Sequence, residues 1–167
     1  TFHMVGLASE VIGTDPRPKG VVILQMTWSA GDPLVAREQL KRLNDLKGKT
    51  VALQQGGPHV GMLDDVLKSA QLSWDDVKVV WTKDLTASPD SPAEVLRKRS
   101  DVDACFAITP DMVGLCGGLT NTGSGAEGTV KGARVLVSTA QLSRSIADVY
   151  VCRKAFYDAN KELVSKF

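Results

Sequence analysis

The clearest pattern along the chain is an alternation of short apolar runs with segments whose apolar residues recur at helical spacing. The run 49–54 is rich in branched apolar residues and stops at Gly56-Gly57, which is typical of a buried strand followed by a turn. Pro58 then suits the first position of a helix, and one apolar face follows, made of Val60, Leu63, Val66, Leu67 and Ala70. This segment therefore predicts a strand, a tight turn and a helix.

The same pattern recurs further along the chain. The β-branched and aromatic run 77–81 predicts a second strand. The tetrapeptide Ser91-Pro92-Ala93-Glu94 has the form of a capping box, which predicts a short helix as far as Lys98. A third strand is expected over 101–108, and Thr109-Pro110-Asp111 then opens a helical piece over 112–116. The other expected elements are a strand-like run over 21–28, strands over 134–137 and 148–151, and a final helix capped by Asp158 that reaches Phe167.

Strands that alternate with helices over short connections indicate the α/β class, with a mainly parallel sheet flanked by helices. We expect the strands near 50–54, 77–81 and 102–108 to be adjacent and parallel, with the loops that follow them on one edge of the sheet. Ligands of such sheets bind beyond the carboxyl ends of the strands. The loops that qualify are Gln55–His59, Trp81–Asp84 and Thr109–Asp111.

Composition narrows the possible functions. A chain of 167 residues with 43% apolar and 23% charged residues can bury a core and form a single domain. Its net charge of +1, without a basic run, speaks against nucleic acid as a partner. The longest apolar stretch, 21–26, is far shorter than the roughly 20 residues that cross a bilayer, and the first residues do not have the pattern of an export signal.

Two motifs favour structural interpretations. Cys105, Cys116 and Cys152 are an odd number without CxxC spacing, which speaks against a disulfide framework or a zinc knuckle, and apolar neighbours favour buried thiols at Cys105 and Cys152. The GxGxxG match over 123–128 neither follows a predicted strand nor opens a helix, so it favours a surface loop.

His59 is the histidine better placed for chemistry, the other being His3. It lies beside two glycines at a predicted helix N-terminus, where backbone N–H groups and the helix dipole favour a negative or polar ligand group. The alternative is a solvated or capping histidine. Since the sequence shows no nucleophile or carboxylate as its partner, and no GxSxG or HExxH motif, His59 indicates binding rather than catalysis.

The other candidate ligand-binding residues are aromatic or acidic. Trp28 and Trp81 each end an apolar run near a loop edge, where an indole ring could wall in a ligand or simply pack in the core. Asp111 could accept a hydrogen bond from a ligand or cap its own short helix.

Three segments carry a family resemblance. They are Asp45-Leu46-Lys47-Gly48-Lys49-Thr50-Val51-Ala52, then Gly57-Pro58-His59 at a helix start, then Val102-Asp103-Ala104 leading into Pro110. Their order resembles that of the nitrate, sulfonate and thiamine-precursor (SsuA-like) solute-binding proteins of ABC importers. The resemblance also includes Thr27-Trp28-Ser29-Ala30-Gly31 and the segment Ala147 to Lys154.

The resemblance implies one lobe of a two-lobed clamshell of the type II periplasmic-binding fold, whose whole is roughly twice as long as this chain. Residues 1–21 would be a remnant of the first lobe, 22–152 the second lobe with both hinge-crossing segments, and 153–167 the start of the return to the first lobe. It further implies a periplasmic or extracytoplasmic receptor that needs no cofactor and delivers a small molecule to a membrane permease.

By the same resemblance, ligand contacts are expected from three groups of residues. They are Thr27, Trp28 and Ser29 at the hinge, Gln55, Gly57, Pro58 and His59 after the first strand, and Thr109 and Asp111 before the last helical piece. A helix N-terminus suits an anion such as a sulfonate, nitrate or carboxylate. Trp28, Trp81, Asp84 and Asp111 would instead suit an aromatic or amine-bearing molecule such as a pyrimidine.

Two other functions share this fold. A pyrimidine-synthesising enzyme would use a histidine and iron, for which two histidines far apart in sequence do not supply a cluster. An effector-sensing domain of a transcription regulator would lie next to a helix-turn-helix. The receptor is the leading hypothesis.

Overall fold

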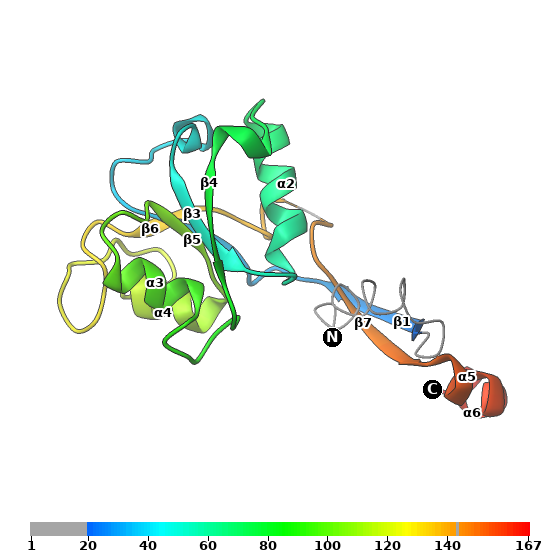
Figure 1. Cartoon of the computed structure of the whole chain (residues 1–167). Coiled ribbons are helices and arrows are strands. Elements are labelled where there is room, and N and C mark those ends of the chain that lie inside the picture. The colour runs from blue at the N-terminus through cyan, green and yellow to red at the C-terminus, as the bar shows by residue number, and fades with distance from the viewer. Residues whose placement is uncertain (1–19, 143) are drawn as a thin grey trace.

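The computed structural model describes residues 20–142 and 144–167, in which strands and helices alternate as predicted (Figure 1). The strands are β1 (Gly20–Trp28), β2 (Pro33–Ala36), β3 (Thr50–Gln54), β4 (Lys78–Thr82), β5 (Ala104–Phe106), β6 (Arg134–Ser138) and β7 (Ala147–Arg153). The helices are α2 (His59–Ser69), α3 (Pro92–Lys98), α4 (Thr109–Cys116), α5 (Lys154–Ala159) and α6 (Lys161–Ser165), with short 3-10 turns η1 (Leu43–Leu46) and η2 (Trp74–Asp76). His3 and most of the predicted remnant 1–21 lie outside the described residues.

Five strands form the main sheet, in the order β4-β3-β5-β2-β6. β3 pairs in parallel with both β4 and β5, as predicted for the strands near 50–54, 77–81 and 102–108. β2 pairs antiparallel with β5 and β6, so four of the five strands run in one direction and β2 alone is reversed. The prediction of an α/β fold with a mainly parallel sheet is confirmed.

Helices cover both faces of this sheet, α2 on one side and α3 with α4 on the other (Figure 1). Alternation along β3 explains how one strand serves two cores. Val51 and Leu53 pack under the apolar face of α2, while Ala52 packs with Leu96 of α3 and Leu115 of α4. The two helical layers leave the carboxyl edge of the parallel strands open for loops.

β1 and β7 form a separate two-stranded antiparallel ribbon that projects from the main domain and ends in α5 and α6 (Figure 1). Its register runs from Gly20 opposite Arg153 to Trp28 opposite Ala147, with irregularities that give one strand extra residues. At its base the N–H of Ser29 donates to the carbonyl of Ile146 at 2.8 Å. The chain therefore enters and leaves the main domain at the same place.

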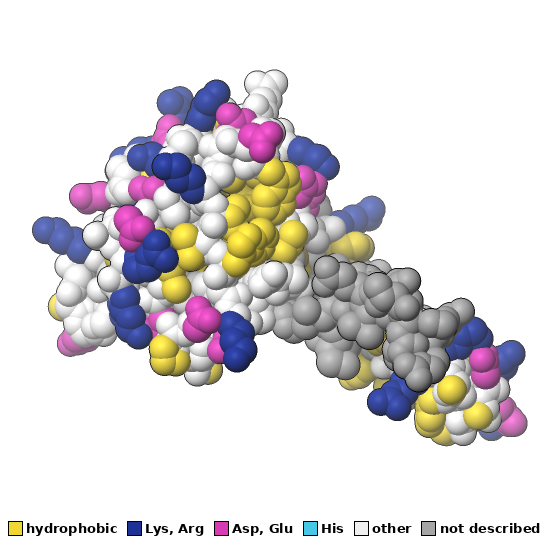
Figure 2. All heavy atoms as spheres, in the orientation of Figure 1, with side chains coloured by type: hydrophobic (Ala, Val, Ile, Leu, Met, Phe, Trp, Pro, Cys, Tyr) yellow, Lys and Arg dark blue, Asp and Glu magenta, His cyan; other side chains and the backbone are white. Residues whose placement is uncertain are grey.

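Large apolar side chains are exposed along this ribbon and its terminal helices, and Figure 2 shows several of them at the tip. The most exposed belong to Val22, Met26, Leu163 and Phe167. A hollow of about 430 Å³ at the tip is lined by Ile23, Phe156, Leu163, Val164, Lys166 and Phe167. Apolar surface gathered on a projecting element is typical of a face that another domain or chain covers.

Some local predictions need correction. The chain after β7 forms two short helices, and Asp158 lies inside α5, where it pairs with Lys154 at 2.7 Å, so it does not cap a final helix. The Ser91–Glu94 capping box is half formed: the Ser91 hydroxyl accepts from the Glu94 N–H, but the Glu94 carboxylate pairs with Arg97 and Lys98. Cys105 and Cys116 are buried, whereas Cys152 on β7 is only half-buried.

Candidate functional site

The loops at the carboxyl edge of the sheet are joined to one another by hydrogen bonds. The N–H of Gln55, after β3, donates to the carbonyl of Thr82 at the end of β4, at 2.9 Å. The Thr109 hydroxyl, at the start of α4, donates to the carbonyl of Gly31 at 2.8 Å. Since β2 is reversed, the segment before it also lies at this edge. The edge therefore unites all three predicted ligand-binding groups, although residues of each group differ in exposure.

Asp32, which precedes β2, is the centre of a buried polar network at this edge. Its carboxylate contacts His59 Nε2 at 2.8 Å and accepts a short hydrogen bond from the Ser29 hydroxyl. Its backbone exchanges hydrogen bonds with Thr139, after β6. Burial acts to raise the pKa of Asp32, but the hydrogen bonds from His59 and Ser29 outweigh burial and hold that pKa below its usual value. The network fixes the segment between β1 and β2 to the start of α2.

The imidazole of His59 lies inside the protein. It is 0% exposed and stacks on Phe106 of β5, with ring centroids 5.4 Å apart. Gly57 and Pro58 are also buried, and an added Cβ at Gly57 would lie 2.8 Å from Gln54 Oε1. Of the four residues predicted to bind ligand in this loop, Gln55 alone is exposed. The His59 side chain therefore has no exposed surface in this structure, and its contacts with Asp32 and Phe106 hold the loop before α2 in place.

The order of groups in this network is not that of a hydrolytic triad. In a triad the histidine lies between the nucleophile and the carboxylate, so that it can take the proton of the nucleophile. Here Asp32 lies between Ser29 and His59, because both side chains contact its carboxylate. The Ser29 hydroxyl donates to the carboxylate, which leaves His59 oriented but not poised to activate serine.

The two candidate tryptophans differ in their surroundings. Trp28 ends β1 next to the network and is 42% exposed, close to the exposed Thr27. Trp81 is 46% exposed but stacks on Trp74 with centroids 6.4 Å apart, on the α2 face of the sheet, as its pairing with Leu53 requires. Trp28 is therefore the exposed aromatic that adjoins the network, and Trp81 packs against Trp74.

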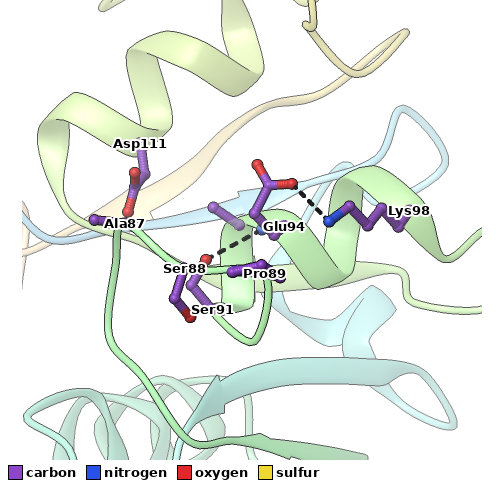
Figure 3. A pocket seen from close by; sticks show the side chains of 8 residues that line it. Ala87, Ser88, Pro89, Ser91, Glu94, Lys98 and Asp111 are labelled. Atoms are coloured by element: carbon purple, nitrogen blue, oxygen red, sulfur yellow. Dashed lines mark hydrogen bonds and ion pairs between the residues drawn. The ribbon is translucent and has the colours of Figure 1, made fainter.

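Asp111 lies in the first turn of α4, where Ile108 is the N-cap residue, so it does not cap the helix. It lines a pocket of about 310 Å³ between α4, α3 and the loop 83–91 (Figure 3).

The buried thiols beneath this region are poor nucleophiles, because burial raises the pKa of Cys116 to about 11 and that of Cys105 further. Within the described residues, no helix is long and apolar enough to span a bilayer, and no cluster of three metal-ligating side chains occurs.

Comparison with solved structures defines the class of fold. The aliphatic sulphonate binding protein SsuA from Escherichia coli superposes with a TM-score of 0.66 at 19% identity, covering 94% of this chain and 48% of that chain. The alkanesulfonate-binding protein SsuA from Xanthomonas axonopodis pv. citri, solved with MOPS, gives 0.62 at 19% identity, covering 99% and 57%. The desulfurization enzyme DSZB gives 0.51 at 18% identity, covering 89% and 53%. The fold is thus that of one part of a periplasmic-binding-protein-like molecule, and the chain spans about half the length of these neighbours.

The family follows from sequence. The model of the family described as "NMT1/THI5 like" matches residues 33–167, so this chain belongs to the NMT1/THI5-like family. Among curated proteins, none matches the chain. The resemblance found in the sequence is confirmed at the level of family and fold.

Proposed function

We propose that this chain is the second lobe of the substrate-binding component of an ABC importer, and that it binds a small polar molecule at the carboxyl edge of its sheet. The main support for this proposal is the family match over residues 33–167. In addition, hydrogen bonds join the segment before β2 to the loops at that edge of the sheet. The named functions of the two SsuA neighbours support the same proposal. An extracytoplasmic location and a membrane permease as partner belong to this proposal.

The lobe boundaries belong to the proposal as well. Residues 22–28 and 147–152 would cross between lobes, because they form the ribbon that leaves the main domain at one place. Residues 153–167 would begin the return to the first lobe, and the exposed apolar side chains of Phe156, Leu163 and Phe167 suit contacts with it.

A second candidate function is enzymatic, since the desulfurization enzyme DSZB has the same fold. Binding is favoured because Asp32 separates Ser29 from His59, and because burial raises the pKa of Cys105 and Cys116. A lobe built to hold a ligand needs only the exposed edge residues.

The test uses the complete two-lobed protein from the parent reading frame. Calorimetric titration with ethanesulfonate, nitrate, acetate and a 4-aminopyrimidine should reveal one saturable ligand, and incubation should leave that ligand unchanged. Trp28→Ala should weaken binding by about 1–3 kcal/mol, the range for a lost aromatic anchor. Trp81→Ala is the matched control, because its indole is equally exposed but stacks on Trp74 away from the network. Conversion of the ligand, or equal losses in both variants, would contradict the proposal.

A further inference from the structure

The pocket between α3, α4 and the loop 83–91 is built entirely from this lobe. It is lined by Ala87, Ser88, Pro89, Ser91, Ala93, Glu94, Lys98 and Asp111, with a volume of about 310 Å³. That volume lies at the lower end of the range for small-molecule sites. Figure 3 shows Asp111 pointing from α4 toward the loop at Ala87, with Ser88, Pro89 and Ser91 along the same wall. A ligand here would not depend on a second lobe for its walls.

One carboxylate oxygen in this pocket lacks a hydrogen-bond partner. Asp111 Oδ2 is buried from solvent, and no donor among the described residues reaches it. Burying a carboxylate oxygen without a donor is unfavourable, and native structures nearly always satisfy such an atom. A missing donor at a pocket wall indicates the chemistry of what binds there: a group that brings its own N–H or O–H.

The other charges of the pocket are already paired. Glu94 Oε2 lies 3.3 Å from Lys98 Nζ, and Glu94 Oε1 contacts the guanidinium of Arg97. The hydroxyls are engaged too, since Ser88 donates to Asp84 at 2.7 Å and Ser91 accepts from the Glu94 N–H. Asp111 is left as the one uncompensated charge of the lining residues. A positive donor therefore suits the pocket better than a neutral donor.

The loop beside Asp111 has a strained backbone at Ala87. Ala87 has a φ of 57°, in the left-handed region that residues with a Cβ rarely adopt. Ala87 and Asp111 line the same pocket, so the strained backbone and the unpartnered carboxylate oxygen belong to one site. Strain and an unpaired charge thus occur at one place.

We propose that this pocket binds a protonated amine, with the Asp111 carboxylate as its acceptor, and that the solute of this receptor carries such a group. The inference rests on the proposed function only in treating the bound amine as part of a transported solute. The pocket itself belongs to the described lobe and can be tested on the 167-residue chain.

The first experiment uses the unmodified chain, labelled with 15N and titrated with ethylammonium chloride at constant ionic strength. Backbone amides of 87–98 and 109–112 should shift in a saturable manner. Ethanol, a neutral molecule of similar size, and tetramethylammonium, a cation without N–H groups, should each bind at least several-fold more weakly. Equal responses to ethanol, to tetramethylammonium or to potassium chloride would overturn the assignment.

The second experiment compares two substitutions of aspartate by asparagine. Asp111→Asn keeps the shape and removes the charge, and it should weaken ethylammonium binding by about tenfold or more. Asp75→Asn removes an exposed carboxylate far from the pocket lining and should leave the affinity unchanged. Equal affinity in Asp111→Asn and the unmodified chain refutes the role of Asp111. If Asp111→Asn does not fold, the comparison of the three probes on the unmodified chain still decides.

The two proposals fail in different ways. Absence of ethylammonium binding to this chain, together with ligand binding by the complete protein, would remove the amine pocket and leave the receptor function in place. Ethylammonium binding here, together with turnover of the ligand by the complete protein, would remove the receptor function and leave the pocket.

Discussion

At Gln71 the backbone takes a left-handed turn that ends α2. Its φ is 57°, the Leu72 N–H donates to the Leu67 carbonyl, and the Gln71 N–H donates to the Lys68 carbonyl. These bonds form a Schellman motif, in which glycine is the usual residue at the left-handed position. A residue with a Cβ in this conformation costs about 1–2 kcal/mol, whereas the extra freedom of glycine in the unfolded chain costs about 0.4–1 kcal/mol.

Gln71→Gly should therefore raise the free energy of unfolding by about 0.5–1 kcal/mol, as measured by urea denaturation. Gln55→Gly provides the control, since Gln55 is also exposed but is not among the residues with positive φ. That variant should be neutral or destabilised. A destabilised Gln71→Gly would show that the Gln71 side chain itself contributes to the fold.

The buried Asp32 contributes a pH-dependent share of stability. Because its folded pKa lies below the unfolded value of about 3.9, its contribution is fully present above that value and is lost as pH falls through the folded pKa. Asp32→Asn should lower the free energy of unfolding by about 1–3 kcal/mol at pH 7, since it weakens buried hydrogen bonds to His59 and Ser29.

The difference between Asp32→Asn and the unmodified chain should begin to shrink below about pH 4, where Asp32 of the unfolded chain becomes protonated, and should be lost as pH falls further through the lower pKa of the folded state. Chemical denaturation across that range measures it. Asp75→Asn, an exposed carboxylate, should show no comparable difference at pH 7. A gap that stays constant down to acidic pH would mean that the carboxylate charge is not what the network uses.

The same residues show how much of the candidate site can be predicted from the sequence alone. The glycines and proline around 56–58 correctly predict a turn and a helix start, because these residues restrict the backbone locally. Nothing local predicts that Asp32 would meet His59, since that contact needs β2 to lie two strands away from β3 in the sheet. His59 was predicted as a ligand contact from its position alone, and its buried carboxylate partner could be found only from the structure.

At the scale of elements, the observed bounds of β3 and β4 lie close to the predicted ones, because each apolar run is long enough to be recognised as a strand. β2 was not predicted as a separate strand, since it has only four residues and follows a longer strand-like run. Its reversed direction is set by pairing with β5 and β6, which are distant in sequence. The split of the final helix at Asn160 was missed because Lys161–Ser165 continues the same polar pattern.

The ribbon formed by β1 and β7 should be separable from the main domain. Its residues pair mainly with each other and with α5, while the five-stranded sheet has its own two cores. A chain of residues 29–146 should therefore keep a cooperative thermal transition close to that of the 167-residue chain. A large fall in the unfolding midpoint would show that the ribbon stabilises the sheet.

The ribbon should also control self-association. Because Val22, Met26, Phe156 and Phe167 are exposed on it, the 167-residue chain should associate more strongly than residues 29–146. Sedimentation equilibrium of both chains at matched concentrations measures the difference. Equal association would indicate that the apolar face lies elsewhere.

At the scale of the whole molecule, two lobes should hold a ligand more tightly than one. A ligand at a hundredfold excess over its dissociation constant stabilises a protein by about 2.7 kcal/mol. At a concentration of the calorimetrically identified ligand that saturates the complete protein, the 167-residue chain should show a much smaller thermal shift. An equal shift in both would mean that one lobe suffices, which would contradict a clamshell.

The reversal of β2 has a mechanical consequence. Because β2 alone runs against its neighbours, the strand that arrives and the strand that departs emerge side by side, joined at Ser29 and Ile146. Two hydrogen-bonded strands on their own form a less stable unit than a sheet of three or more strands. Asp32 lies only a few residues after Ser29, and its carboxylate contacts the His59 imidazole. Bending of the ribbon at this joint would therefore act directly on the segment that holds His59 at the start of α2.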